Sequence, residues 1–374
     1  IKMHQLKLKV NIISGNQSLK SLKKNIIDLN FKNEFLICDD VLKDNIYIKK
    51  NIKNIKNKLF IKFKTEPTYQ MLNEYIKIIK NIKIDCIIAI GGGSTMDFAK
   101  GLATLYTNPV NSLKLMGFPK NLNNPLPVIT VPSTTSTGSE VTYNAVFTDS
   151  EKKKKLGINS EKNYPILAIL DPFIISQTPK NIIYQSSIAS LMRALETFVT
   201  EDSNEVTKYF SKISFNLLVQ SLLKNKLNIK DYENLQWGCI FSMFALSNSS
   251  AGPSGVINYF LSSNYKISQP LSYCFSAIEF IKFNIDKGYY HYGDILDKKS
   301  NPKMNSVKLI KILKKVINNI KKEIFETKLN LSNQKNIEFQ IFEAFKNINF
   351  LPLQKNPIKI KHSELKEIIT KVIN

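Results

Sequence analysis

A glycine-rich turn carries the strongest chemical signal in this chain. Consecutive glycines follow the apolar run Cys86–Ile90 and precede a polar stretch, and the residues of interest are Gly91, Gly92, Gly93, Ser94 and Asp97. An apolar run that opens through glycines onto a helical pattern is typical of a buried strand that turns into a helix. Glycine leaves no Cβ between backbone and ligand, and free N–H groups at a helix start favour an anion. The spacing therefore predicts a phosphate-binding turn, and a tight turn packed without a ligand is the alternative.

A hydroxyl-rich segment supports the phosphate-binding interpretation. The apolar run Val128–Val131 reads as another buried strand, and it leads into a loop of serines and threonines that includes Thr134 and Thr137. Two strands that each end in a loop able to approach phosphate are what a dinucleotide requires. Together the two segments predict a dinucleotide held between two loops.

These two segments resemble the iron-containing alcohol dehydrogenase family, which includes glycerol dehydrogenases and is similar in fold to dehydroquinate synthase. Gly91–Lys100 is similar to the family's GGGSxxDxxK box, and Pro132–Glu140 is similar to its PTTxGTGSE box, with Ser133 and Ser136 as departures. Asn144 and Lys155 also fall where the family has similar residues near its cofactor. The resemblance implies an NAD or NADP cofactor, bound in part by these residues.

The metal ligands of that family are missing from this chain. The family holds a divalent metal with one Asp and three His, and the four aligned positions here are Ala189, Arg193, Gly255 and Gln269. Imidazole and carboxylate are the usual ligands for such a metal, and none of these positions offers either. We therefore expect no metal site of the family kind. A further family histidine, near the reacting carbon, aligns with Tyr259.

Arg193 is the only arginine in the chain, and it occupies one of the lost ligand positions. A guanidinium is a planar, permanently charged fork that grips carboxylate or phosphate in two places. Arg193 is therefore a candidate for anchoring an anionic substrate or polarising its carbonyl, while Tyr259 or a water relays the proton, and Asn258 and Gln269 line the site. The alternative is a simple ion pair with Glu196 or another carboxylate on the helix surface.

The periodicity of apolar residues divides the chain into two halves. Up to Pro172 short apolar runs alternate with amphipathic stretches, which predicts a mostly parallel sheet covered by helices on both faces. The runs are Lys7–Ile13, Phe35–Cys38, Leu59–Phe63, Ile84–Ile90, Val128–Val131 and Ile166–Leu170. Beyond Pro172 the pattern becomes helical. We predict an α/β dinucleotide-binding domain over residues 1–172, an all-α domain over residues 173–374, and a site in the cleft between them.

Asp39 ends the predicted strand Phe35–Cys38. An acidic side chain at such a strand end accepts hydrogen bonds from an adenosine ribose and repels a 2′-phosphate, which favours NAD over NADP. The alternative is that Asp39 and Asp40 form a turn or a helix cap.

Composition limits the remaining classes of function. The net charge of +23 is spread along the whole chain rather than concentrated, so we expect no nucleic-acid partner. The four cysteines lack CxxC spacing and indicate reduced thiols, and no apolar stretch is long enough to span a bilayer. These features favour a cytoplasmic protein without a membrane partner.

The combined interpretation is an NAD(P)-dependent, metal-independent oxidoreductase of the alcohol dehydrogenase or reductase type, acting on a small, anionic carbonyl compound. One branch of the family, the maleylacetate reductases, also dispenses with the metal. The alternative is a pseudoenzyme that keeps the fold and nucleotide binding but has a degenerate catalytic site. The resemblance further implies a homodimer.

Overall fold

The structure is a computed structural model that describes residues 6–63, 66–135, 138–152, 154–255, 257–258, 261, 268–324, 336–346 and 351–373. The chain divides into two compact units, Leu8–Thr178 and Pro179–Asn374, the second of which includes Ile1–Lys7. The predicted boundary at Pro172 lies six residues earlier, at the first residue of a short helix of the first unit.

A six-stranded parallel sheet forms the centre of the first unit, in the order β1-β8-β5-β4-β2-β3. Its strands are β1 (Asn11–Ser14), β2 (Glu34–Asp39), β3 (Asn57–Ile61), β4 (Cys86–Gly91), β5 (Val128–Pro132) and β8 (Leu167–Leu170). Each strand overlaps one of the apolar runs of the sequence. The predicted fold class, a parallel α/β unit followed by a helical one, is confirmed.

Both faces of this sheet are buried, because alternate residues of each strand enter different cores. Leu36 and Cys38 of β2 belong to one core, whereas Phe35 and Ile37 of the same strand belong to the other. A strand buried on both faces reads as a continuous apolar run, which is why these strands were visible in the sequence.

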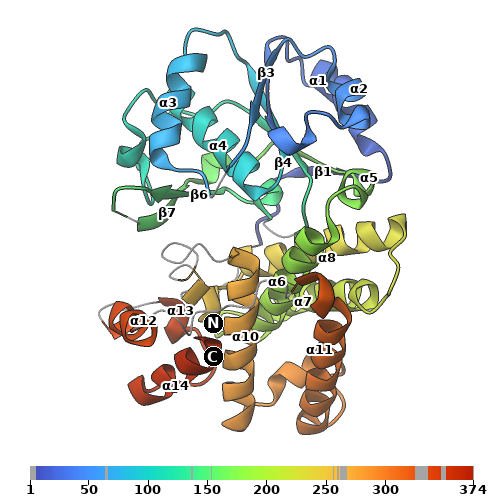
Figure 1. The fold of residues 1–374 in the computed structure, drawn as a ribbon, viewed down its shortest axis with the longest axis vertical. Helices are drawn as coiled ribbons and strands as arrows, with labels where there is room; N and C mark the ends of the chain where they lie inside the picture. Colours follow the sequence, from blue (N-terminus) through green and yellow to red (C-terminus); the bar gives the residue numbers. More distant parts are fainter. Residues whose placement is uncertain are drawn as a thin grey trace. The chain divides into compact units, whose positions relative to one another are not determined.

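Helices cover the two faces in separate groups (Figure 1). One group contributes Leu22, Ile48 and Ile174 to its core, and it consists of α1 (Leu22–Asp28), α2 (Ile46–Ile52) and α5 (Pro172–Ser176). The other group consists of α3 (Tyr69–Ile79) and α4 (Gly93–Thr107). Local capping fixes where several of them begin. The side chains of Asn45, Thr68 and Asp171 accept backbone N–H groups at the starts of α2, α3 and α5.

An antiparallel hairpin was not anticipated from the sequence. Strands β6 (Asn144–Asp149) and β7 (Lys154–Asn159) pair with Asn144 opposite Asn159, and Ala145 and Phe147 are buried. The run Lys152–Lys155 suggested a solvated turn, but its last two residues begin β7. Alternation around Phe147 was the available signal, and it was too short to outweigh the lysines.

The described residues of the second unit form helices and no strand. The helices are α6 (Lys180–Val199), α7 (Glu205–Leu222), α8 (Ile229–Ser247), α10 (Gln269–Asp286), α11 (Pro302–Ile324), α12 (Ile337–Lys346), α13 (Leu351–Gln354) and α14 (His362–Ile373). Asn204 and Asn228 start α7 and α8 with capping boxes. None of the described helices combines the length and the apolar character that crossing a bilayer requires.

Candidate functional site

The glycine turn exposes a small set of residues within an otherwise buried segment. From Cys86 to Leu105, only Gly92, Ser94 and Asp97 are partly exposed, and every other residue is buried. Thr134, at the start of the hydroxyl-rich loop, is also partly exposed between buried neighbours. The carboxyl ends of two adjacent strands, β4 and β5, therefore present four residues from which a ligand can be bound.

The three glycines of the turn have different surroundings. Gly92 caps α4 with an extended backbone, and a Cβ added there would meet Thr134 Cγ2 at 3.5 Å, an ordinary contact. A Cβ added at Gly91 would lie 2.5 Å from Thr95 Oγ1 and 2.7 Å from Thr95 Cβ. Gly91 is thus required by packing, and Gly93 is buried. Only Gly92 leaves its missing side chain on the accessible side of the turn.

Protein donors already hold the carboxylate of Asp97. Ser139 donates its hydroxyl to Oδ1 at 2.5 Å, and the Val146 N–H donates to Oδ2 at 3.0 Å. Burial raises the pKa of Asp97, and the nearby ammonium of Lys100 opposes this rise. Asp97 therefore connects the first turn of α4 to the hydroxyl-rich loop and to β6, and only part of its surface remains available to a ligand.

Lys100 is a residue of this site whose role sequence reasoning missed. Its side chain is buried, and its ammonium donates to the carbonyl oxygens of Ser139 at 3.0 Å, Thr142 at 3.2 Å and Asn144 at 2.5 Å. The ammonium also lies 3.5 Å from Asp97 Oδ1. The signal was present, because a lysine among the apolar residues Phe98, Ala99 and Leu102 of a helix is expected to be buried with partners for its charge.

The hairpin carries the two other residues that the resemblance placed near a cofactor. Asn144 is exposed and donates its side-chain amide to Asn159 at 2.8 Å. The side chain of Lys155 is buried, and its ammonium lies 2.5 Å from Glu66 Oε1. Burial lowers the pKa of Lys155, and Glu66 opposes that effect. A ligand that contacts Lys155 has to share its ammonium with Glu66.

Asp39 adopts the alternative that the sequence left open for it. Its side chain accepts the Val41 N–H at 3.3 Å and caps a short 3₁₀ helix, Asp40–Leu42. Burial raises the pKa of Asp39, and its carboxylate is still partly exposed at the end of β2. Because Asp39 caps this helix and is still partly exposed, its binding of a ribose stays a prediction. Thr137, the other predicted loop residue, lies outside the described residues.

In the helical unit, one face of α6 carries two of the residues that the resemblance aligns with metal ligands. Gln185, Ala189, Arg193 and Glu196 follow one another at intervals of four, four and three, so they lie on the same side of the helix. Gln185 accepts the Ser268 hydroxyl at 2.9 Å, next to the first residue of α10, Gln269. Ala189 and Arg193, which the resemblance aligns with metal ligands, therefore share one face of α6, and the hydrogen bond of Gln185 brings the start of α10, with Gln269, next to the same face.

Glu196 anchors the segment that carries Gly255, another residue that the resemblance aligns with a metal ligand. Its Oε1 accepts the N–H of Ser254 at 3.1 Å and the hydroxyl of Ser254 at 2.5 Å, and its Oε2 accepts the hydroxyl of Tyr273 in a short hydrogen bond. Gly255 follows Ser254 directly, and a Cβ added to it would meet no atom within 4 Å. Burial raises the pKa of Glu196, and donors from Ser254 and Tyr273 oppose the rise.

Arg193 makes contacts that the sequence could not specify. Its Nη1 donates to Ser242 Oγ on α8 at 3.2 Å and to Ser190 Oγ at 3.5 Å, and its side chain is partly exposed. The buried Asn258 accepts the Ser272 hydroxyl at 2.5 Å, which occupies one of its polar atoms. Tyr259, the predicted proton relay, lies outside the described residues.

The four residues that the resemblance aligns with the family's metal ligands do not form a donor set suited to a divalent metal. Ala189 and Gly255 offer no ligand atom, Arg193 is a permanent cation, and Gln269 offers only a neutral amide. Within the described part of the chain, no three His, Cys, Asp or Glu side chains group closely enough to hold a metal ion.

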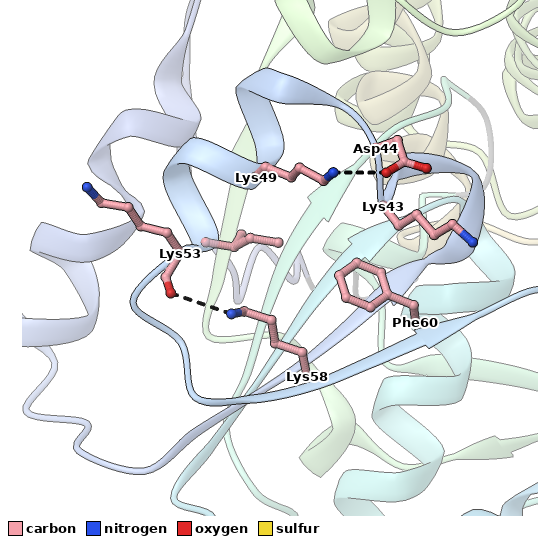
Figure 2. Close-up of a pocket in the computed structure, with 7 residues that line it drawn as sticks. Lys43, Asp44, Lys49, Lys53, Lys58 and Phe60 are labelled. Carbon is pink, nitrogen blue, oxygen red and sulfur yellow. Dashed lines mark hydrogen bonds and ion pairs between the residues drawn. The ribbon is translucent and has the colours of Figure 1, made fainter.

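A surface pocket of about 350 Å³ lies beside β3, lined by Lys43, Asp44, Lys49, Ile52, Lys53, Lys58 and Phe60. Figure 2 shows that its lysines do not converge on one point. Lys49 pairs with Asp44 at 2.9 Å, and Lys58 donates to the Lys53 carbonyl at 3.5 Å. The ammonium of Lys53 points away from Phe60. The arrangement does not form an anion site.

Comparison with known proteins gives a consistent set of similarities. Residues 10–172 match the sequence profile of the family described as iron-containing alcohol dehydrogenase. The chain is 31% identical over 207 residues to a 4-hydroxybutyrate dehydrogenase of Clostridium kluyveri, covering 54% of this chain and 55% of that protein. It is 24% identical over 295 residues to an NAD-dependent methanol dehydrogenase of Bacillus methanolicus, covering 76% and 77%. The match thus spans about half the length of the first relative.

A solved structure resembles the whole chain. The sulfoacetaldehyde reductase of Bifidobacterium kashiwanohense, solved in complex with NAD+, superposes with a TM-score of 0.88 and covers 100% of this chain and 99% of its own. The two sequences are 18% identical, so this likeness concerns the fold.

Proposed function

We propose that the chain is a member of the iron-containing alcohol dehydrogenase family and an NAD(P)-dependent oxidoreductase, with NAD favoured over NADP, that works without a metal on a small, anionic carbonyl compound. The observation that carries the proposal is the set Gly92, Ser94, Asp97 and Thr134, which are the accessible residues at the carboxyl ends of β4 and β5. The similar proteins support an oxidoreductase, since they include an NAD-dependent methanol dehydrogenase and a reductase solved in complex with NAD+.

In this proposal the glycine turn binds the diphosphate. The N–H groups at the start of the 15-residue helix α4 favour an anion, and the open side of Gly92 leaves room for phosphate oxygens. Thr134 and Thr137 donate hydroxyls, Asp39 accepts from a ribose and so favours NAD over NADP, and Asn144 and Lys155 bind beyond the diphosphate. The bound nicotinamide supplies or accepts the hydride.

The absence of a metal is the second part of the proposal. Ala189, Arg193, Gly255 and Gln269 provide no pair of anionic or imidazole ligands, so we assign the charge-stabilising role to Arg193. Its guanidinium is held by Ser242 and Ser190 and is partly exposed, which suits contact with a carboxylate, sulfonate or phosphate of the substrate. Gln269 and Asn258 contribute polar lining, and Tyr259 or a water delivers the proton.

The test is a screen of oxo-acids, phosphorylated aldehydes and neutral aldehydes with NADH and NADPH. We expect turnover of anionic substrates, and we expect Arg193→Lys to lower kcat/KM for them by about tenfold or more, because lysine keeps the charge but loses the fork. Lys180→Met, at the exposed first residue of the same helix, controls for long-range charge and should have little effect.

Two outcomes would contradict parts of the proposal. Turnover that favours neutral aldehydes and is indifferent to Arg193→Lys would remove the anchor role. NADH binding without hydride transfer to any substrate would favour the pseudoenzyme, for which the four different residue types at the lost metal positions are the supporting observation. The homodimer and the cytoplasmic location stay predictions, and light scattering of the purified protein tests the first.

A further inference from the structure

Lys100 ends the glycine-rich motif, yet the proposed cofactor chemistry leaves it without a task. It is 1% exposed, on a helix whose neighbouring residues Phe98, Ala99 and Leu102 are buried apolar side chains. A buried ammonium is costly unless its charge and its three N–H groups are satisfied. In this structure backbone carbonyl oxygens take all three donors, from Ser139, Thr142 and Asn144.

We propose that Lys100 acts as a tethered internal cation, whose ammonium fixes the segment 139–146 to α4 and thereby positions the candidate cofactor residues Asp97 and Asn144. Three carbonyl oxygens and a carboxylate around one positive charge are the surroundings that a bound monovalent cation would have. Here the cation is supplied by the protein itself. As a statement about cofactor affinity, this inference rests on the proposed function, whereas its structural part does not.

The contacts around Lys100 connect both loops of the proposed dinucleotide site. The first carbonyl belongs to Ser139 of the short 3₁₀ turn Ser139–Val141, the second to Thr142 directly after that turn, and the third to Asn144, the first residue of β6. Asp97 adds two further links to the same segment, through the Ser139 hydroxyl and the Val146 N–H. Five hydrogen bonds thus join α4, which begins at the glycine turn, to the residues that follow the hydroxyl-rich loop.

The charges agree with this role. Burial lowers the pKa of Lys100, and the carboxylates of Asp97 and Glu140 oppose that effect. The pair Asp97 and Lys100 are 3.5 Å apart, and removing one partner of a buried pair leaves the other uncompensated. The carbonyl oxygens would lose their donors in the same step. Loss of the ammonium should therefore release the whole segment 139–146.

The experiment is chemical rescue of Lys100→Ala. This variant removes the ammonium and three methylenes, and it leaves space for a small alkylammonium ion among the three carbonyls. We expect a lower Tm and an NADH affinity weaker by at least about tenfold. Ethylammonium or propylammonium chloride should raise both, with a response that saturates. Tetramethylammonium chloride at the same ionic strength has no N–H donor and should restore neither.

Two control variants make the rescue specific. Lys100→Met fills the space with an apolar chain, so it should show the same loss but no recovery with alkylammonium. Lys162→Ala removes an exposed lysine that donates to a single carbonyl, that of Leu122, at 2.6 Å, and its Tm should not respond to the amines. A wild-type Tm and affinity in Lys100→Met, or equal recovery with tetramethylammonium, would overturn the proposal.

A measurement on the unaltered protein covers the case in which Lys100→Ala does not fold. With lysine labelled by ¹⁵N at Nζ, an ammonium held by three carbonyls should give a slowly exchanging NH₃⁺ signal, absent in Lys100→Met. Exchange as fast as that of the exposed lysines would overturn the inference. If the wild type fails to bind NADH, the proposed function fails, while the amine response of Tm still decides the role of Lys100.

Discussion

The substitution Gly92→Ala separates what the fold requires at the glycine turn from what a bound diphosphate requires. The added Cβ would meet only Thr134, at 3.5 Å from Cγ2 and 3.7 Å from Oγ1, and the backbone angles of Gly92 (φ −77°, ψ −174°) suit any residue. We therefore expect the free energy of unfolding to change by less than about 0.5 kcal/mol. A phosphate at the turn would collide with the methyl group.

The size of the binding loss follows from the cost of overpacking. Inserting a methyl group into a filled contact costs about 1–3 kcal/mol, so NAD affinity should fall by about 5- to 150-fold in Gly92→Ala. Gly91→Ala adds the same group one residue earlier, where Thr95 Cβ is only 2.7 Å away. That variant should lose about 1–3 kcal/mol of stability instead.

Two assays read the two effects separately. Isothermal titration calorimetry gives the dissociation constants of NAD and NADP, and urea denaturation gives the stability of each variant. The reasoning is refuted if Gly92→Ala binds NAD as the wild type does while remaining folded, because the open side of Gly92 would then face no ligand. Equal destabilisation of both alanine variants would refute the packing argument for Gly91.

Three further predictions concern stability and metal content. Asp171 is fully buried and accepts four hydrogen bonds, from three backbone N–H groups and the Tyr47 hydroxyl, so Asp171→Asn should cost about 2–4 kcal/mol in urea denaturation. Burial raises the pKa of Glu196 above 4.5, so between pH 4.5 and that raised pKa the folded state binds more protons than the unfolded state, and stability falls as the pH rises. Glu196→Gln should flatten this fall when urea midpoints are measured from pH 4.5 upward. Elemental analysis should find no stoichiometric iron or zinc, and one equivalent per chain that resists mild chelation would contradict the proposed loss of the metal site.

Strands buried on both faces could be predicted from the sequence, whereas the hairpin could not. β4 and β5 are continuous apolar runs because both faces of the sheet are covered. β6 and β7 have one covered face, and the polar residues of Lys154–Asn159 conceal their alternation. Gly157 also interrupts the apolar pattern of β7. A Cβ there would lie 2.7 Å from the Ala145 carbonyl oxygen, so the paired strands require glycine, and the sequence alone does not show that requirement.

In the candidate site, the types of residue could be predicted from the sequence, whereas their contacts could not. Motif spacing led to Gly92 and Asp97, because phosphate chemistry restricts which residue types suit such a turn. It could not reveal that Lys100 donates to three carbonyl oxygens, since those belong to residues more than thirty positions away. Nor could it reveal that Gly91 is required by packing, since that depends on how the turn places Thr95 against it. Likewise, Arg193 donates to Ser190 and Ser242, and no pattern in the sequence marks these serines as its partners.

The lysine on β3 has a consequence for how molecules of this protein meet in solution. β3 lies at one edge of the sheet, and an edge strand can pair with a strand of another molecule. Lys58 lies on β3 and is exposed (Figure 2), so a strand added at this edge would have to approach a hydrated ammonium group. We therefore expect this lysine to disfavour edge-to-edge pairing of two sheets, an effect that requires no ligand.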